Sequence, residues 1–396
     1  MVPVVVIFVD SLMPESVEYM DFLNSLNIAR IQTELPSYSN TCLASAYTGV
    51  YPNKHKHFFI WRYSPNTSPF KLMRVFSRVK LHRIFMSKYL KLMLFATICK
   101  LKRGVIPFRS FLLERSVDYW SNFDFSMIRY WGKPDMYIGK YPTIFKLLND
   151  AGIKYYLIYE VKGKLKRINK MLNKIKLTNF TKPSYLIYIF LGHIDTITHF
   201  HGQTSLVGRI ALKQLDKFIE SIYSRFERSF NDDFLILIFS DHGQAMIRER
   251  INLHSIFRSK KKWLNDYIAI IDSCYARFWF RNEQEKKEVE IVLRELEDKG
   301  MILTHDYLRR YHAEMPKDQG ELIFLLEKSR VFEEATNRKY AFMHGYSPDN
   351  PELDGLCALN KKILRSRIRL QDIAPSILKA LYMKIPEYMD GGPIWR

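Results

Sequence analysis

Short apolar runs separated by amphipathic stretches organise most of the chain. Four runs are apolar at nearly every position, which is typical of strands buried on both faces of a parallel sheet. They cover residues 4–10, 155–160, 184–192 and 234–241. Apolar residues recur at helical spacing over 143–153 and 208–226. The alternation of such strands with helices predicts an α/β fold, doubly wound, with a mostly parallel sheet and helices on both faces.

Two regions interrupt this pattern. Residues 64–134 form a basic, aromatic insertion. Residues 255–335 contain two strand-like runs, 274–280 and 321–327, on either side of a long charged helical stretch, which predicts a small α+β subdomain. The chain has 396 residues, of which 47% are hydrophobic, so it can bury a large core. We therefore expect one large α/β domain over residues 1–396 that carries both insertions, or else two domains.

Positive charge is concentrated in one part of the chain. The formal net charge is +20, and the stretch from Leu35 to Leu113 holds 14 Lys and Arg but no Asp or Glu. Such a field attracts phosphate groups, whether on a small substrate, a nucleic acid or an anionic membrane, and charge alone does not distinguish them.

Within this stretch, residues 71–103 combine ten Lys and Arg with many large apolar residues. That composition is typical of a segment that lies on an anionic membrane or admits a lipid-linked substrate. It fits equally well a cap that packs its apolar side on the core and leaves its lysines in water. A nucleic-acid-binding module is absent from the sequence, so no specific nucleic acid is expected.

The cysteine pattern and the lengths of the apolar segments indicate the cellular compartment. Cys42, Cys99, Cys274 and Cys357 are scattered, with no CxxC pair, so we expect reduced thiols and no structural zinc site. The first apolar run ends in Asp10 and lacks the basic start of a signal peptide, and no run reaches the roughly 18 apolar residues of a spanning helix. We expect a cytoplasmic protein, peripheral at the membrane if the basic segment docks there. The sequence does not indicate an oligomeric state.

Acidic residues and histidines follow the predicted strands, at the sheet edge where α/β proteins bind ligands. They are Asp10, Asp195, His199, Asp241, His242 and, further on, His344. A lone Asp there more often caps a helix or forms a turn, and a lone His more often packs. Three carboxylates at one edge would repel each other unless cations neutralised them. Because carboxylate with imidazole is a ligand set suited to zinc, the two clusters suggest two metal ions.

Residues 35–55, LPSYSNTCLASAYTGVYPNKH, crowd hydroxyl groups at a turn that leads into a small-residue helix. Most of these hydroxyls are expected to cap or support the helix start. One of them could instead be a nucleophile, activated by ligation to a metal that lowers its pKa.

In order and internal spacing these motifs resemble the alkaline phosphatase superfamily, and within it the type I phosphodiesterase and nucleotide pyrophosphatase branch. The motifs are Asp10; Pro36-Ser37-Tyr38-Ser39 leading to Thr48-Gly49; Asp195, His199 and Gly202; Ser240-Asp241-His242-Gly243; and His344-Gly345. The C-terminal residues 370–394 also match the closing helix and Met-Asp-Gly turn of the family. The resemblance spans nearly the whole chain and implies an alkaline-phosphatase-like fold.

The resemblance implies Ser39 as the nucleophile, because the family's nucleophile lies nine residues before the position of Thr48. Thr41 is the alternative, since threonine is the commoner nucleophile in this branch. Relatives often carry an asparagine three residues after the nucleophile that holds the phosphoryl group. Here that position is Cys42, and Asn40 follows Ser39 directly, so both are candidate substrate-binding residues.

The resemblance also assigns the metal ligands. One metal would be held by Asp195, His199 and His344, and the other by Asp10, Asp241, His242 and the Ser39 oxygen. His193 and His201 flank the second motif and could compete with His199 as ligands, although the resemblance favours His199. Zinc is the family expectation, with manganese as the alternative.

The function implied is a metal-dependent hydrolase of phosphodiester or pyrophosphate bonds that works through a phosphoserine intermediate, on a nucleotide or a lipid-linked phosphate ester. A phosphomonoesterase or phosphotransferase would use the same site. A third alternative is a non-catalytic protein that binds membranes or nucleic acid. That alternative predicts missing ligands, and the sequence supplies the full set.

Overall fold

The computed structural model describes residues 3–75, 88–103, 111–125, 137–160, 165–174, 185–231, 233–335 and 338–396. The chain divides into two compact units. Unit 1 consists of residues 1–55, 134–247 and 339–396, and unit 2 of residues 56–133 and 248–338. The two predicted insertions, 64–134 and 255–335, therefore lie largely within unit 2.

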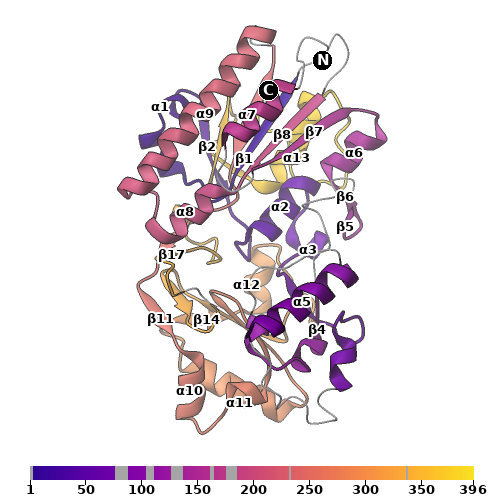
Figure 1. The fold of residues 1–396 in the computed structure, drawn as a ribbon, viewed down its shortest axis with the longest axis vertical. Coiled ribbons are helices and arrows are strands. Elements are labelled where there is room, and N and C mark those ends of the chain that lie inside the picture. Colours follow the sequence, from indigo (N-terminus) through magenta and orange to yellow (C-terminus); the bar gives the residue numbers. More distant parts are fainter. Residues whose placement is uncertain are drawn as a thin grey trace. The chain divides into compact units, whose positions relative to one another are not determined.

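Unit 1 is built on a seven-stranded sheet of order β19-β2-β18-β9-β1-β8-β7 (Figure 1). The strands are β1 (Val4–Val9), β2 (Asn27–Gln32), β7 (Lys154–Tyr159), β8 (Tyr185–Leu191), β9 (Leu235–Phe239), β18 (Gly355–Leu359) and β19 (Arg367–Arg369). The four apolar runs are β1, β7, β8 and β9, which pair in parallel. β18 runs antiparallel to β9 and β2, whereas β19 is parallel to β2. The predicted mostly parallel sheet is thus confirmed.

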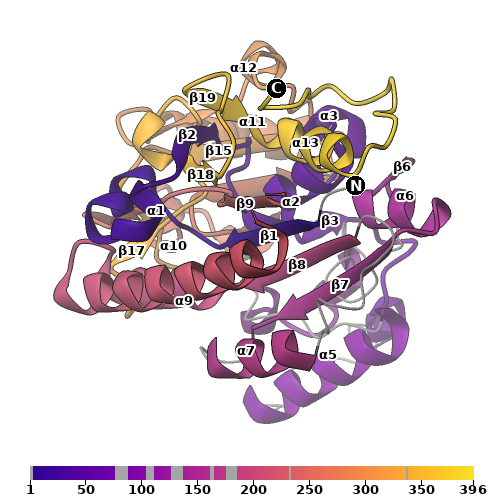
Figure 2. The same cartoon turned by 90° about the horizontal axis from the view of Figure 1, so that it is seen from above.

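Helices cover both faces of this sheet (Figure 2). On one face α1 (Asp21–Asn24), α7 (Leu165–Lys174) and α9 (Leu206–Phe230) pack on apolar side chains of alternate strand positions. On the other face lie α2 (Ser39–Thr48) and α6 (Ile144–Asp150), whose Tyr47 and Phe145 contact Tyr188 of β8. α13 (Ile373–Ala380) packs beside α2. Burial of both sheet faces explains why the central strands are apolar throughout.

Helix α9 shows how local sequence sets these boundaries. Leu212, Leu215 and Ile219 recur at the spacing of one helix face and are buried against the sheet. The Ser205 side chain caps the first turn by accepting a hydrogen bond from the Gly208 N–H over 3.0 Å. The helix ends at Asn231, which adopts a left-handed conformation with φ 46°.

The remaining elements of unit 1 are short and mostly lead into or out of the site. They are η1 (Pro14–Tyr19), α3 (Pro52–His55), β5 (Tyr137–Ile138), β6 (Tyr141–Pro142), α8 (His193–His201), β10 (Ala245–Met246), β17 (Phe342–Met343), η8 (Pro351–Leu353) and η9 (Leu370–Asp372). β10 pairs with β17 in antiparallel fashion, and this pairing fixes the segment that carries His344.

Unit 2 contains an antiparallel sheet of order β12-β13-β15-β14. Its elements are β3 (Trp61–Tyr63), η2 (Lys71–Met73), α5 (Lys88–Arg103), η4 (Phe111–Glu114), η5 (Tyr119–Asn122), β4 (Phe123–Phe125), β11 (Glu249–Ile251), α10 (Leu253–Ser259), η7 (Leu264–Asp266), β12 (Ile268–Ile271), β13 (Tyr275–Trp279), α11 (Glu283–Arg294), β14 (Gly300–Ile302), α12 (His305–Arg310), β15 (Leu322–Leu326) and β16 (Arg330–Phe332). The strand-like runs at 274–280 and 321–327 contain β13 and β15, and the charged stretch between them contains α11.

The basic segment 71–103 is partly described. Its residues 76–87 lie outside the described residues, and α5 accounts for its second half. Phe95 and Cys99 of α5 are buried in an aromatic cluster that includes Trp61, Phe70 and Trp120. No helix among the residues that the structure describes has the length and apolar content needed to cross a membrane.

Candidate active site

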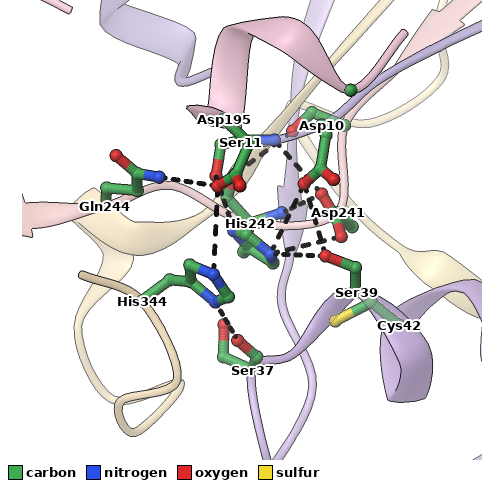
Figure 3. Close-up of polar contacts among 12 residues, drawn as sticks. Asp10, Ser11, Ser37, Ser39, Cys42, Asp195, Asp241, His242, Gln244 and His344 are labelled. Carbon is green, nitrogen blue, oxygen red and sulfur yellow. Dashed lines mark hydrogen bonds and ion pairs between the residues drawn. The ribbon is translucent and has the colours of Figure 1, made fainter. Parts of the chain in front are cut away.

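Residues far apart in the sequence meet at the carboxyl edge of the unit 1 sheet (Figure 3). Asp10 directly follows β1, and Asp241 and His242 follow β9. α8, which comes after β8, carries Asp195 and His199, four residues apart and so on one face of the helix. The parallel neighbours β8, β1 and β9 bring these three chain segments side by side.

The six predicted ligands form two groups, each with its donor atoms within 4.8 Å of one another. The first group is Asp195, His199 and His344. Nε2 of His199 lies 3.3 Å from Asp195 Oδ1, and Nε2 of His344 lies 3.9 Å from the same oxygen. The antiparallel bridge between Ser37 and Gly345 helps to hold His344 here, although it is more than 140 residues away from Asp195 in the chain.

The second group is Asp10, Asp241 and His242. Nε2 of His242 lies 3.3 Å from Asp241 Oδ2 and 3.8 Å from Asp10 Oδ1. The hydroxyl of Ser39 joins this group: it donates a hydrogen bond to Asp10 Oδ1 over 3.3 Å and lies 3.1 Å from His242 Nε2. The six residues that sequence analysis placed at one sheet edge are therefore adjacent in space.

The three histidines share one orientation. Nδ1 of His199 faces the Phe342 carbonyl at 2.8 Å, Nδ1 of His344 faces the Ser37 carbonyl at 3.1 Å, and Nδ1 of His242 faces the Gly243 carbonyl at 3.2 Å. A carbonyl oxygen can only accept, so each neutral ring carries its proton on Nδ1. Each Nε2 lone pair is then left pointing at the carboxylates, as a metal-binding imidazole requires.

Burial dominates the electrostatics of the second group. It raises the pKa of Asp10 well above the usual value, and the nearby Asp241 and Asp195 carboxylates raise it further. Burial likewise raises the pKa of Asp241 to about 7. The pKa of His242 falls to about 4 and that of His344 to about 3, chiefly because burial disfavours the imidazolium. Both rings are thus neutral near pH 7.

Asp195 and His199 shift each other's pKa in opposite directions. Burial by itself would raise the pKa of Asp195, but the imidazoles of His199 and His344 outweigh it and lower that pKa below its usual range. The pKa of His199 is raised: burial opposes its charge, and the Asp195 carboxylate more than compensates. Asp195 is therefore the carboxylate with the strongest tendency to stay ionised in this group.

The donor set fits divalent cations. Three carboxylates and three imidazole nitrogens converge in a buried site, and no Lys or Arg forms an ion pair with these carboxylates among the described residues. Repulsion between the carboxylates is relieved if cations lie between them. Carboxylate oxygen with imidazole nitrogen is a set that zinc and manganese accept.

Sequence analysis did not single out Ser11, which lies between the two groups. Its hydroxyl donates a hydrogen bond of 2.8 Å to Asp195 Oδ1 and lies 3.1 Å from His242 Nδ1. Ser11 has φ 64°, a left-handed conformation uncommon for a residue with a side chain. A serine after a strand-ending Asp looks like an ordinary turn residue, so the sequence held no distinguishing signal.

Two glutamines were also missed. Gln244 Nε2 donates to Asp195 Oδ1 over 2.7 Å, and the Gln203 amide donates to the Ser11 carbonyl. Both side chains are buried. They hold Asp195 and the Ser11 turn in place, a role that depends on neighbours distant in sequence.

The residues around the predicted nucleophile differ in exposure. Ser39 begins α2 and is half-buried, and Asn40, its neighbour, is half-buried too. Thr41 is completely buried. Cys42 is also completely buried, with its sulfur 3.6 Å from the Thr33 hydroxyl, and burial raises the pKa of its thiol well above the ordinary value. Substrate contacts by Asn40 and Cys42 stay predictions.

The two competing histidines lie elsewhere. Nδ1 of His193 is 2.7 Å from a Glu160 carboxylate oxygen, which also accepts a hydrogen bond from the His193 backbone N–H. His201 is exposed at the end of α8. Neither belongs to the two groups of potential ligands found among the described residues.

The mostly parallel sheet with helices on both faces is an alkaline-phosphatase-like α/β fold. A sequence model described as type I phosphodiesterase / nucleotide pyrophosphatase matches residues 101–347. The chain belongs to this family, which places it among the phosphodiester hydrolases. No curated protein matches the sequence.

Solved structures confirm the fold. Murine ectonucleotide pyrophosphatase / phosphodiesterase 5, an inactive variant in complex with AMP, superimposes with a TM-score of 0.68 at 10% sequence identity, over 98% of both chains. The human protein of that name gives a TM-score of 0.69 at 11% identity, over 98% of this chain and 97% of that one. At such low identity the likeness establishes the architecture alone.

Proposed function

We propose that this protein hydrolyses phosphodiester or pyrophosphate bonds at a two-metal site, with Ser39 as the nucleophile. The observation that carries the proposal is the position of the Ser39 hydroxyl, 3.1 Å from His242 Nε2 and 3.3 Å from Asp10 Oδ1. Thr41, the alternative nucleophile, is completely buried.

The two groups would each hold one divalent cation. Asp195, His199 and His344 supply one set of ligands, and Asp10, Asp241 and His242, with the Ser39 oxygen, supply the other. Bound cations would lower the pKa of the Ser39 hydroxyl and neutralise charge on the phosphoryl oxygens. We propose zinc, which suits the mixed nitrogen and oxygen donors, with manganese as the alternative.

The residues of the chain then act in a defined order. Ser39 Oγ releases its proton to solvent and attacks phosphorus. The bond to the leaving oxygen breaks, so that a phosphoserine forms and the leaving group takes up a proton from solvent. Water then attacks the same phosphorus, the bond to Oγ breaks, and the Ser39 hydroxyl is restored. Because Ser39 is the first residue of the ten-residue helix α2, the positive end of the helix dipole favours the phosphoryl group at both stages.

A nucleotide is the substrate class we favour. The murine relative was solved in complex with AMP, and the strongly basic composition of the chain attracts phosphate groups. We also propose a reducing, cytoplasmic compartment, supported by the buried thiols of Cys42, Cys99 and Cys357.

The test is hydrolysis of three chromogenic esters by protein stripped of metal and then supplied with zinc or manganese. They are p-nitrophenyl phosphate, bis-p-nitrophenyl phosphate and p-nitrophenyl thymidine monophosphate. We expect metal-dependent cleavage of the two diesters, lost in Ser39→Ala and kept in Thr41→Val, which retains the buried volume of Thr41. Stronger cleavage of the monoester would point to the phosphomonoesterase alternative.

Two further outcomes would contradict the proposal. If Thr41→Val abolishes turnover and Ser39→Ala does not, the nucleophile is Thr41. If the protein binds two metal ions per chain and leaves all three esters intact, the non-catalytic alternative gains support.

A further inference from the structure

Helix α5 belongs to unit 2 (Figure 1). Some of its apolar side chains are buried and others are exposed. The inner side is anchored: Phe95 and Cys99 are 1% and 0% exposed. The Phe95 ring stacks on Phe70, with centroids 5.0 Å apart, and meets the edge of Trp120 at the same distance. This packing holds α5 against unit 2 and determines which side of the helix faces the core of that unit.

The outer side is apolar as well. Tyr89, Met93 and Leu101 are 85%, 63% and 77% exposed, and they recur at multiples of four residues, so they form one stripe along the helix. Leu90 and Leu92 beside them are also exposed. If α5 only covered the core, the burial of Phe95 and Cys99 would be explained, but the apolar side chains of this stripe would face water without a role. Large contiguous exposed apolar patches mark interaction sites.

Exposed lysines accompany the stripe. Lys100 is exposed on α5 itself, and Lys71 is exposed in η2. The sequence supplies no acidic residue from Leu35 to Leu113 to neutralise them. The segment just after Phe70, whose ring packs on α5, adds Leu72 and Val75 as exposed apolar side chains.

We infer that the outer side of α5 docks on the surface of an anionic phospholipid bilayer, with Tyr89, Met93 and Leu101 at the acyl boundary and the lysines at the headgroups. The positive charge favours an anionic bilayer over the other possible partners of this surface. A second copy of the chain would bring two basic surfaces together, which is repulsive. Nucleic acid would be met by basic and stacking aromatic side chains, whereas this stripe is chiefly aliphatic. At 16 residues α5 would lie along the surface, as amphipathic interfacial helices do.

The experiment is co-sedimentation of the full chain with vesicles of phosphatidylcholine alone or mixed with phosphatidylserine, at low and moderate salt. Deletion of the segment would remove Phe95 and unfold the core, so point variants are needed. The apolar variant is Tyr89→Ser/Met93→Ser/Leu101→Ser. Its control is Ile291→Ser, an apolar residue of α11 whose exposure of 61% is close to the 63% of Met93. The charge variant is Lys71→Glu/Lys100→Glu, with Lys287→Glu of α11 as its control.

We expect binding to the anionic vesicles that weakens with salt and is at least tenfold weaker for neutral vesicles. Each lysine removed should cost about fivefold in affinity. The apolar variant should lose binding while keeping the melting temperature of the parent, and both α11 controls should bind normally.

Three results would overturn the inference. The intact chain fails to bind anionic vesicles, or the apolar variant binds them as well as the parent does. Alternatively, gel filtration without lipid shows a dimer that the apolar variant converts to a monomer, in which case a second copy covers the stripe. None of these measurements depends on catalysis, so the inference can fail while the proposed function stands.

Discussion

The Ser11 hydroxyl donates a hydrogen bond of 2.8 Å to Asp195 Oδ1. Oγ of Ser11 also lies 3.1 Å from Nδ1 of His242, which belongs to the other group of ligands. Ser11 therefore connects two ligands that would bind different cations, and it does so from a left-handed backbone conformation. Backbone strain of this kind persists where the surrounding structure requires it.

Replacing Ser11 with glycine should weaken metal binding. Glycine adopts φ 64° without strain, so Ser11→Gly removes the hydroxyl and preserves the turn. Loss of a hydrogen bond that orients a ligand typically reduces metal affinity by about 10- to 100-fold. Calorimetric titration of the metal-free variant with zinc measures this directly, and Ser205→Gly, at the N-cap of α9, serves as the control for a lost serine outside the site. Unchanged zinc affinity in Ser11→Gly would rule out an orienting role.

Metal removal should destabilise the protein. Cations that bind only the folded chain stabilise it by about 4 kcal/mol when their free concentration is roughly 1,000 times the Kd. We expect chelation to lower the Tm and addition of zinc or manganese to restore it, as followed by scanning calorimetry. Without metal, Asp241→Asn should have a higher Tm than the parent, because one of three crowded carboxylates is then neutral. Added metal should raise the Tm of this variant less than that of the parent. A Tm indifferent to zinc and manganese in the parent would contradict the two-metal site.

Glu34 should make stability depend on pH. Burial raises the pKa of this carboxyl to about 7, although hydrogen bonds from Ser45 and Gln371 oppose the shift. Between its unfolded pKa near 4.5 and about 7, the folded chain holds a proton that the unfolded chain releases, so stability falls as pH rises through this window. The loss is on the order of 3 kcal/mol.

Urea unfolding at about pH 5 and about pH 8 measures this loss, and Glu34→Gln, which cannot ionise, should remove it. The difference between parent and variant isolates Glu34 from the other titrating groups. Equal pH dependence of the two proteins would show that Glu34 is ionised in the folded state throughout.

Gly208 should tolerate no side chain. A Cβ atom at this position would lie 2.2 Å from the Gly202 carbonyl oxygen and 2.7 Å from that of Gln203. Because both contacts are to backbone, Gly208→Ala must displace α9 from the turn that follows α8, at a cost of about 1–3 kcal/mol. Gln214→Ala, an exposed position of the same helix, should stay within about 0.5 kcal/mol of the parent in urea unfolding. If Gly208→Ala lowers the free energy of unfolding no more than Gln214→Ala does, the turn after α8 adjusts without cost.

Much of unit 1 could be predicted from the sequence because its signals are local. A strand buried on both faces needs apolar residues at every position, so β1, β8 and β9 were visible as uninterrupted runs. The edge strand β7 is mostly half-buried, but its aromatic and aliphatic residues gave the same signal. β2, at 27–32, was missed: only alternate residues of it are buried, and it pairs with strands from the far end of the chain. A short strand of mixed character depends on its partners, which no local pattern describes.

The sequence by itself determined which chemical groups the site would hold, since Asp10, Asp241 and His242 stand directly after strands and their neighbours follow a family pattern. Only the tertiary structure decided how these groups face one another. The orientation of three histidines by backbone carbonyls, the Ser11 hydroxyl between the groups and the exposed stripe of α5 all depend on contacts between distant segments. A helical pattern predicts which residues share one face of a helix. Packing in the folded protein determines whether that face contacts the core or water.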